Sequence, residues 1–146
     1  MLYCKKLDEN AVMPTVNYPG EDLAFDFYAL ENTVLNPRVV TKVKTGIAAR
    51  FIKKNSTDKN YGLLLRDRSS MAIKGITVSA GVVDAGYSNE ILVLLTNNTN
   101  EPYYISKGNK IVQAIPVEVL TENGVEEVEQ LPESIRKEKG FGSSGI

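Results

Sequence analysis

Residues 91 to 95 read ILVLL, an unbroken apolar run typical of a strand that is buried on both faces. The chain around it has the same character, because short runs rich in β-branched residues recur with Gly, Pro, Asn or Asp between them. No long helical period competes with these runs. The sequence therefore predicts an all-β protein, a jelly-roll-like barrel or sandwich, with strands near 39–43, 46–52, 62–65, 76–83, 91–95 and 111–120.

One short helix is expected within this pattern. The stretch SSMAIKG, residues 69 to 75, begins with a serine suited to the N-cap and ends at Gly75, a helix stop. The polar stretch 53–62 predicts a loop, and TENGVEE at 121–127 carries an Asn-Gly turn signal between strands. From about Pro132 the strand pattern fails. We expect one β domain at 1–131, followed by a C-terminal arm at 132–146.

Composition narrows the class of protein. With 146 residues, 42% of them hydrophobic and 24% charged, the chain has the composition of one soluble globular domain. No apolar run reaches the roughly 18 residues of a membrane span, and the N-terminus has no signal-like stretch, so a cytoplasmic location is expected. The net charge of −1 gives no bulk case for nucleic acid.

The chain has one cysteine, Cys4, and no histidine. An intrachain disulfide is therefore impossible, and a cysteine-built zinc site is not expected. Imidazole bases and imidazole metal ligands are also excluded in this chain. Any catalytic base is expected to be a carboxylate, and any metal a hard, oxygen-liganded ion such as Mg²⁺.

Polar residues stand where strands end, and each has a plain structural alternative. Asp84 and Tyr87 lie on a predicted hairpin turn after an apolar strand, where D-A-G is also an ordinary turn. Arg68 and the serines after it bring N–H groups, hydroxyls and a guanidinium to one helix start, an anion site by geometry or a simple serine cap. Asp26 and Gln113 interrupt apolar strands and could face solvent.

The end of the chain, RKEKGFGSSGI at 136–146, is rich in glycine and costly to order in isolation. A frayed terminus and a glycine-rich phosphate cradle are both open from these residues alone.

In this order and spacing, GEDLAFDFYA, RDRSSMAIKGI, AGVVDAGYSNEI, GNKIVQ and RKEKGFGSSG resemble the five motifs of the trimeric dUTP diphosphatase (dUTPase) family, over residues 20–145. The resemblance implies homotrimers of jelly-roll-like subunits with active sites between subunits. It also implies Mg²⁺-assisted hydrolysis of dUTP to dUMP and diphosphate, which limits uracil incorporation into DNA and supplies dUMP for dTMP synthesis.

The resemblance also implies the role of each site residue. Asp84 would activate the attacking water and hold the sugar 3′-OH, Tyr87 would exclude a 2′-OH, and Asp26 would reach Mg²⁺ through water. The backbone around Gly81 and Val83 would read uracil, and Phe141 would stack on it. The phosphate contacts would be Arg68, Ser69, Ser70, Gln113, Arg136, Gly142, Ser143 and Ser144.

The chain departs from the family pattern at Asp67, Asn89, Asn109-Lys110 and Ser144, none of which removes a catalytic group. The related dCTP deaminases place a catalytic glutamate where this chain has Leu94, so deamination is not expected. A non-enzymatic module or a nucleotide-gated regulator is compatible with the fold alone.

Overall fold

The computed structural model describes residues 1–53 and 60–133. Strands dominate it, as predicted, and one short helix accompanies them. In chain order the elements are β1 (Leu2–Lys6), β2 (Phe25–Tyr28), β3 (Thr33–Leu35), β4 (Val40–Phe51), β5 (Tyr61–Arg66), α1 (Ser69–Ala72), β6 (Ile76–Val78), β7 (Val82–Val83), β8 (Glu90–Asn97), β9 (Tyr103–Ile105) and β10 (Lys110–Glu118). The all-β prediction is confirmed.

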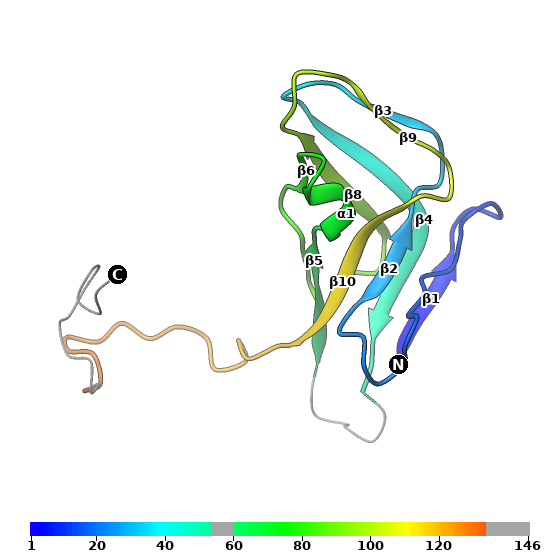
Figure 1. Ribbon diagram of the computed structural model, residues 1–146. Helices are drawn as coiled ribbons and strands as arrows, with labels where there is room; N and C mark the ends of the chain where they lie inside the picture. Colours follow the sequence, from blue (N-terminus) through cyan, green and yellow to red (C-terminus); the bar gives the residue numbers. More distant parts are fainter. Residues whose placement is uncertain (54–59, 134–146) are drawn as a thin grey trace.

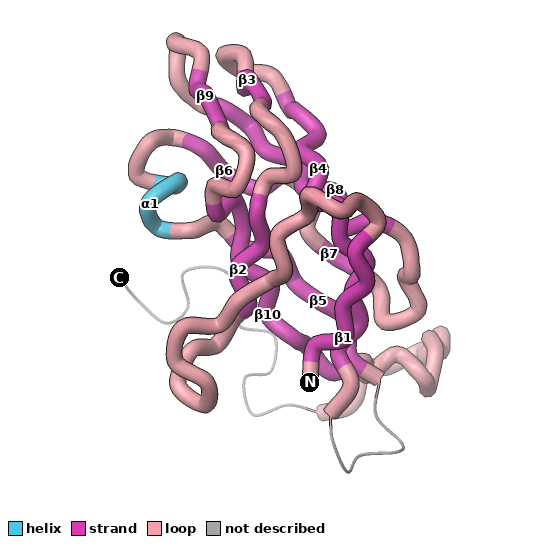
Figure 2. Tube along the Cα trace, turned by 90° about the vertical axis from the view of Figure 1, so that its right-hand side faces the viewer, coloured by secondary structure: helices cyan, strands magenta, loops and turns pink. Residues whose placement is uncertain are grey.

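Eight strands form one antiparallel sheet that encloses the core (Figure 1). Its main path runs β2-β10-β5-β4-β8-β6, while β1 pairs with β4 and β7 pairs with β5. A separate ribbon of β3 and β9 lies at one end of the molecule (Figure 2). The buried side chains form a single apolar cluster, whose largest fully buried members include Phe27, Leu35, Ile47, Ile91, Leu95 and Ile111.

Two predicted strands, 39–43 and 46–52, are one long strand, β4. Its register against β8 shifts between Lys44 and Ala48, at Gly46, whose φ is +67°. A Cβ on Gly46 would lie 2.9 Å from the Cβ of Ala11, so glycine fits both the backbone and the packing there. The Glu90 carboxylate accepts the Gly46 N–H at 2.7 Å and thereby ties the irregularity to β8.

The run that predicted a strand buried on both faces is β8, and this prediction is wrong for one face. Ile91, Val93 and Leu95 are buried, whereas Leu92 and Leu94 are only partly buried. Leucine at these two positions faces a cavity instead of a second layer of core. The continuous apolar run therefore belongs to a strand with one face in the core and the other face on a concave surface.

The predicted strand 76–83 is divided into β6 and β7. Ala80 and Gly81 lie between them with φ of 59° and 143°, values that turn the chain from one strand partner to another. The Gly81 carbonyl accepts the Leu65 N–H at 2.7 Å, which places β7 against β5 while β6 stays with β8.

The helix α1 starts at Ser69, the first residue of the predicted stretch, and ends at Ala72, three residues before Gly75. Arg68 is the N-cap of α1 and makes no side-chain hydrogen bond to the helix. The prediction of a serine at the N-cap was therefore wrong. Gly75 has φ of 76°, as expected of a helix stop.

The turn at 121–127 is present, with the Gly124 N–H donating to the Thr121 carbonyl at 3.1 Å. In the described residues that follow it, up to 133, there is no strand, so this turn does not join two strands. Beyond β10 the chain runs away from the sheet (Figure 1). Residues 54–59 of the predicted loop and residues 134–146 of the predicted arm lie outside the described residues.

Composition and pattern did not identify β1, β3 and β9, whereas β2 is the apolar strand that Asp26 was predicted to interrupt. Among the described residues, no helix is long and apolar enough to cross a membrane.

Candidate active site

The turn between β7 and β8 carries two of the predicted site residues. Backbone and side chains fix it from three sides. The Tyr87 N–H donates to the Asp84 carbonyl at 3.0 Å, and the Tyr87 hydroxyl donates to the Glu90 carbonyl at 2.9 Å. From β4, Arg50 Nε donates to the Ala85 carbonyl at 3.0 Å. The hairpin therefore holds the Tyr87 ring in one orientation.

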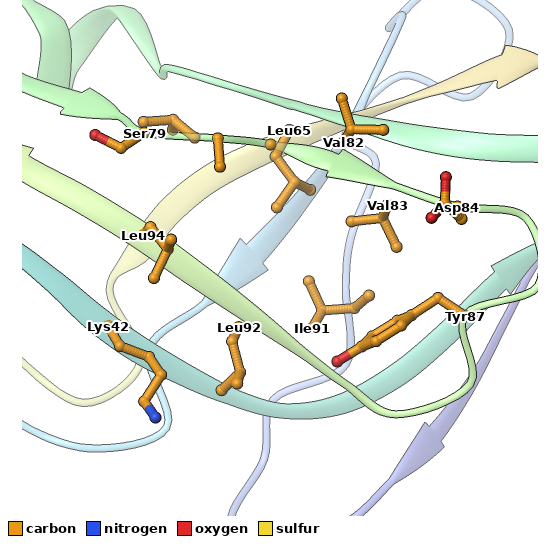
Figure 3. Close-up of a pocket in the computed structure, with 13 residues that line it drawn as sticks. Lys42, Leu65, Ser79, Val82, Val83, Asp84, Tyr87, Ile91, Leu92 and Leu94 are labelled. Carbon is orange, nitrogen blue, oxygen red and sulfur yellow. The ribbon is translucent and has the colours of Figure 1, made fainter.

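A cavity of about 440 Å³ opens between β7 and β8, and we call it the hairpin cavity. Figure 3 shows Asp84 and Tyr87 at one end and Leu94 and Ser79 at the other. Its thirteen lining residues are Lys42, Leu65, Val78, Ser79, Ala80, Gly81, Val82, Val83, Asp84, Tyr87, Ile91, Leu92 and Leu94. The residues predicted to contact base and sugar within the described chain thus lie around one concave surface.

The hairpin cavity exists because its two walls belong to different ladders. β7 pairs with β5, and β8 pairs with β4 and β6, while no ladder within residues 1–53 and 60–133 joins β7 to β8. Gly62 allows the β5 side of this arrangement, since a Cβ there would lie 2.8 Å from the Val83 carbonyl. The two strands consequently flank a gap with backbone on one side and the partly buried Leu92 and Leu94 on the other.

A second cavity of about 260 Å³ is lined by Asn17, Asp22, Leu23, Ala24, Asp26, Arg68, Ser69 and Gln113, and we call it the Asp26 cavity. Four of the predicted site residues are in this set. Asp26, whose side chain is 13% exposed, accepts Arg68 Nε at 2.9 Å and Lys110 Nζ at 2.7 Å. A nearly buried carboxylate therefore has one cation on each oxygen.

Gln113 lies opposite Asp26 in the pairing of β10 with β2. Its amide nitrogen donates to the Asp67 carbonyl at 2.6 Å. The Asp67 carboxylate in turn accepts the Val78 N–H, so this departure from the family pattern joins the end of β5 to β6. Asn109 also departs from the family pattern. Its side-chain oxygen accepts the Ser106 N–H at 2.8 Å and so closes the turn before β10.

Ser70 is exposed on α1 and lines neither cavity. The predicted contacts Arg136, Phe141, Gly142, Ser143 and Ser144 lie outside the described residues. Sequence reasoning treated Lys110 only as a departure and did not identify Arg50 or Asn17. Their contacts join segments distant in sequence, and no local pattern marks them.

The fit to a metal ion can be tested on these contacts. Among the described residues, no three His, Cys, Asp or Glu side chains cluster to hold an ion. Asp22 accepts the N–H groups of Asn17 and Tyr18, each at 3.0 Å, and Asp26 is committed to two cations. Both carboxylates that line the Asp26 cavity therefore already have protein partners, and a Mg²⁺ ion there could contact Asp26 only through water.

The two cavities flank β5 on opposite edges. Val83 pairs with Leu63 on one edge, and Gln113 pairs with Arg66 on the other. The offset of three residues along β5 corresponds to about 10 Å. Within one chain, Asp84 and Arg68 thus line different cavities.

Comparison with known proteins gives a consistent result. A sequence model of the dUTPase family matches residues 9–145. The deoxyuridine 5′-triphosphate nucleotidohydrolase of Helicobacter hepaticus is 36% identical over 145 residues, which covers 97% of this chain and 87% of the relative. The enzyme of the same name from Yaba monkey tumor virus is 32% identical, with coverage of 100% and 97%.

Solved structures agree with the sequence matches. The dUTPase of Staphylococcus bacteriophage 80alpha with dUpNHpp superposes with a TM-score of 0.85 at 29% identity, covering 100% of this chain and 99% of that one. A variant of the dUTPase from phage phi11 of S. aureus, which coordinates a structural Mg(II) ion, has a TM-score of 0.78 at 24% identity, covering 91% and 99%.

Proposed function

This chain belongs to the dUTPase family, and we propose that it hydrolyses dUTP to dUMP and diphosphate by Mg²⁺-assisted, in-line attack of a water molecule. The observation that carries the proposal is the hairpin cavity, which has Gly81, Val83, Asp84 and Tyr87 on its wall. Such a reaction limits uracil in DNA and supplies dUMP for dTMP synthesis. The single cysteine, which can form no intrachain disulfide, suits a cytoplasmic enzyme.

The gap between β7 and β8 suits a flat base that takes the place of a neighbouring strand. Backbone N–H and C=O groups around Gly81 and Val83 would then read the uracil edge. Cytosine exchanges a donor for an acceptor at that edge and leaves backbone groups unpaired, which costs about 1–3 kcal/mol for each group. Discrimination thus comes from backbone that the β5 ladder holds in place.

Tyr87 is positioned to read the sugar. Its hydroxyl donates its hydrogen to the Glu90 carbonyl, which orients the ring so that its face and edge are offered to the sugar. A packed aromatic ring excludes an added hydroxyl by contact and by leaving it without a partner. A deoxyribose fits against the ring without either cost.

Asp84 is exposed at the end of the hairpin cavity, next to Tyr87. A carboxylate at this place can orient a water molecule, accept its proton and bond the sugar 3′-OH. The opposite end of the cavity has Leu94, whose side chain has no acid–base group. Deamination, which needs such a group beside the base, is not part of the proposed function.

The Asp26 cavity would take the triphosphate. Arg68 and the hydroxyl of Ser69 supply charge and hydrogen bonds, and Gln113 lines the same wall. Mg²⁺ bound with the nucleotide would neutralise phosphate charge, and Asp26 would contact its water shell. These groups align the phosphate chain for in-line attack.

The two cavities lie on opposite edges of β5, and this separation suits a site that is shared between subunits. We infer a homotrimer in which the hairpin cavity of one subunit meets the Asp26 cavity of another. The arm at 132–146, with Phe141 and the serines after it, would complete the site, as the resemblance of its motif implies. No nucleic acid or membrane partner is part of the proposed function.

The test is steady-state release of diphosphate from dUTP, dCTP, dTTP and UTP by the wild-type chain and by Asp84→Asn. We expect strong preference for dUTP, and a loss of turnover of about 100-fold or more in the variant with nucleotide binding retained. Glu31→Gln is the matched control, because this exposed carboxylate pairs with Lys44, at 3.7 Å, away from both cavities. Normal turnover by Asp84→Asn would remove Asp84 from the catalytic role.

A further inference from the structure

The cluster around Asp26 joins three parts of the chain that are far apart in sequence. Asp26 is in β2, Arg68 is the N-cap of α1, and Lys110 begins β10. The two cations take different oxygens of the carboxylate, Oδ1 for Arg68 and Oδ2 for Lys110. All three side chains are at most about one-quarter exposed, so solvent screens the pairs only partly.

The Lys110 ammonium is fixed on several sides. Besides Asp26, its Nζ contacts Asn17 Oδ1 at 3.4 Å and lies 5.9 Å from the centre of the Tyr28 ring. The Tyr28 hydroxyl is itself bonded to Thr15 Oγ1 at 2.6 Å. Two of the three ammonium donors of Lys110 thus have protein acceptors, and Lys110 does not line the Asp26 cavity, which makes it a support for Asp26 and not a direct ligand of phosphate.

Arg68 is held in a different way. Its Nε bond to Asp26 uses the inner side of the guanidinium, and the residue lines the Asp26 cavity. A guanidinium is a rigid planar fork, so fixing Nε also fixes the direction of the two terminal nitrogens. If Asp26 were bonded to Arg68 alone, its carboxylate could rotate together with the guanidinium. The sheet would then no longer fix the direction of the two terminal nitrogens.

Charge gives a second argument. Asp26 with Arg68 alone is a neutral pair, whereas Asp26 with both cations retains one positive charge beside the cavity. A net positive charge attracts a polyanion, and a neutral pair does so only through its dipole.

We propose that Lys110 is a positioning residue for the phosphate chain, acting through Asp26 on Arg68 and supplying the uncompensated positive charge. This inference rests on the proposed function, since it assigns the Asp26 cavity to the substrate phosphates. It gives the lysine of the GNKIVQ stretch a role in the reaction although it does not touch the substrate.

The experiment compares Lys110→Met, Lys110→Arg and the control Lys107→Met. Lys107 lies on the turn before β10, and its Nζ donates to Asn10 Oδ1 at 3.0 Å. It lines neither cavity, so Lys107→Met removes the same charge as Lys110→Met without touching the proposed site. For each full-length protein we would measure kcat and KM for dUTP, and inhibition constants for α,β-imido-dUTP with Mg²⁺ and for deoxyuridine.

We expect Lys110→Met to weaken the binding of α,β-imido-dUTP by about 10-fold or more, the usual effect of losing a charge-assisted contact. The inhibition constant of deoxyuridine should stay within about 2-fold of the wild-type value. Lys110→Arg should recover most of the loss, and Lys107→Met should match the wild type. In an Arg68→Met background, Lys110→Met should cost much less than in the wild type, because the two residues act through one carboxylate.

The results separate the inference from the function on which it rests. A wild-type chain that does not release diphosphate from dUTP contradicts the proposed function itself. An active wild type in which Lys110→Met matches Lys107→Met overturns the role of Lys110. If Lys110→Met weakens the binding of the analogue and of deoxyuridine equally, the role of Lys110 is also overturned, because a general loss of structure would affect both ligands alike.

Discussion

At the scale of single residues, the contacts assign a separate job to each part of the Tyr87 side chain. The hydroxyl is used internally, by donation to the Glu90 carbonyl, and the ring lines the hairpin cavity. Tyr87→Phe removes the hydroxyl and keeps the ring, whereas Tyr87→Ala removes both. A test of sugar selection needs both variants, because only their comparison separates the ring contact from the orienting hydrogen bond.

We expect Tyr87→Ala to reduce the preference for dUTP over UTP by an amount equivalent to about 1–3 kcal/mol, since the packed contact that excludes a 2′-OH is lost. Tyr87→Phe keeps the ring and should keep most of the preference. The measurement is the ratio of kcat/KM for the two nucleotides. An unchanged ratio in Tyr87→Ala means that another group rejects the ribose.

The contribution of Lys110 to stability should depend on pH. The hydrogen bond to Asp26 raises the pKa of Lys110 above its ordinary value of 10.5. A raised pKa in the folded state means that this contribution to stability is complete below pH 10.5 and is lost as the pH rises through the folded-state pKa. The difference in Tm between wild type and Lys110→Met should therefore shrink with alkalinity. A difference that grows would contradict the assignment.

At the scale of elements, two glycines lie in or next to the hairpin, and the structure requires only one of them. Gly81 has φ of 143°, and a Cβ there would lie 2.7 Å from the Leu65 carbonyl. Gly86, in the turn itself, has no atom within 4 Å of a Cβ. One glycine is thus required by backbone and space, while the other is required by neither in this conformation.

Gly81→Ala should destabilise the fold by about 1–3 kcal/mol, from strained backbone and displacement of β7 from β5. Gly86→Ala is the matched control and should change stability by less than about 1 kcal/mol. Denaturant unfolding at equilibrium measures both. Equal stabilities would show that the chain relaxes around position 81 without cost.

The elements also show what the sequence could predict. β5, β8 and β10 were found because their own residues carry the pattern, and Gly75 marked the end of α1. The division at Ala80 and Gly81 was missed because it depends on which neighbouring strand each half joins. β3 and β9 have three residues each, too few for a periodic signal. Likewise, the cluster of Asp26, Arg68 and Lys110 exists only after distant strands and a helix have assembled.

At the scale of the whole molecule, the separation of the two cavities predicts complementation. Chains with Asp84→Asn retain an intact Asp26 cavity, and chains with Arg68→Gln retain an intact hairpin cavity. If each site joins two subunits of a trimer, random mixing of the two inactive chains gives about one quarter of sites with both parts intact.

Co-expression or joint refolding of the two variants, followed by assay of diphosphate release, should therefore recover about one quarter of the wild-type activity. Each variant refolded alone is the control. No recovery in trimers that contain both chains would mean that Asp84 and Arg68 of the same chain serve the same nucleotide.

The place of β10 in the sheet has a consequence for synthesis of the protein. β10 follows the other strands of the described chain but lies between β2 and β5 in the sheet order. Until residues 110–118 have left the ribosome, β2 has no partner in the main sheet and β5 lacks one of its neighbours. Pairings between distant segments form late, so the nascent chain is expected to remain unfolded until β10 has left the ribosome. Ribosome-bound chains that stop before β10 should therefore be digested readily by protease, whereas chains whose β10 has emerged should resist.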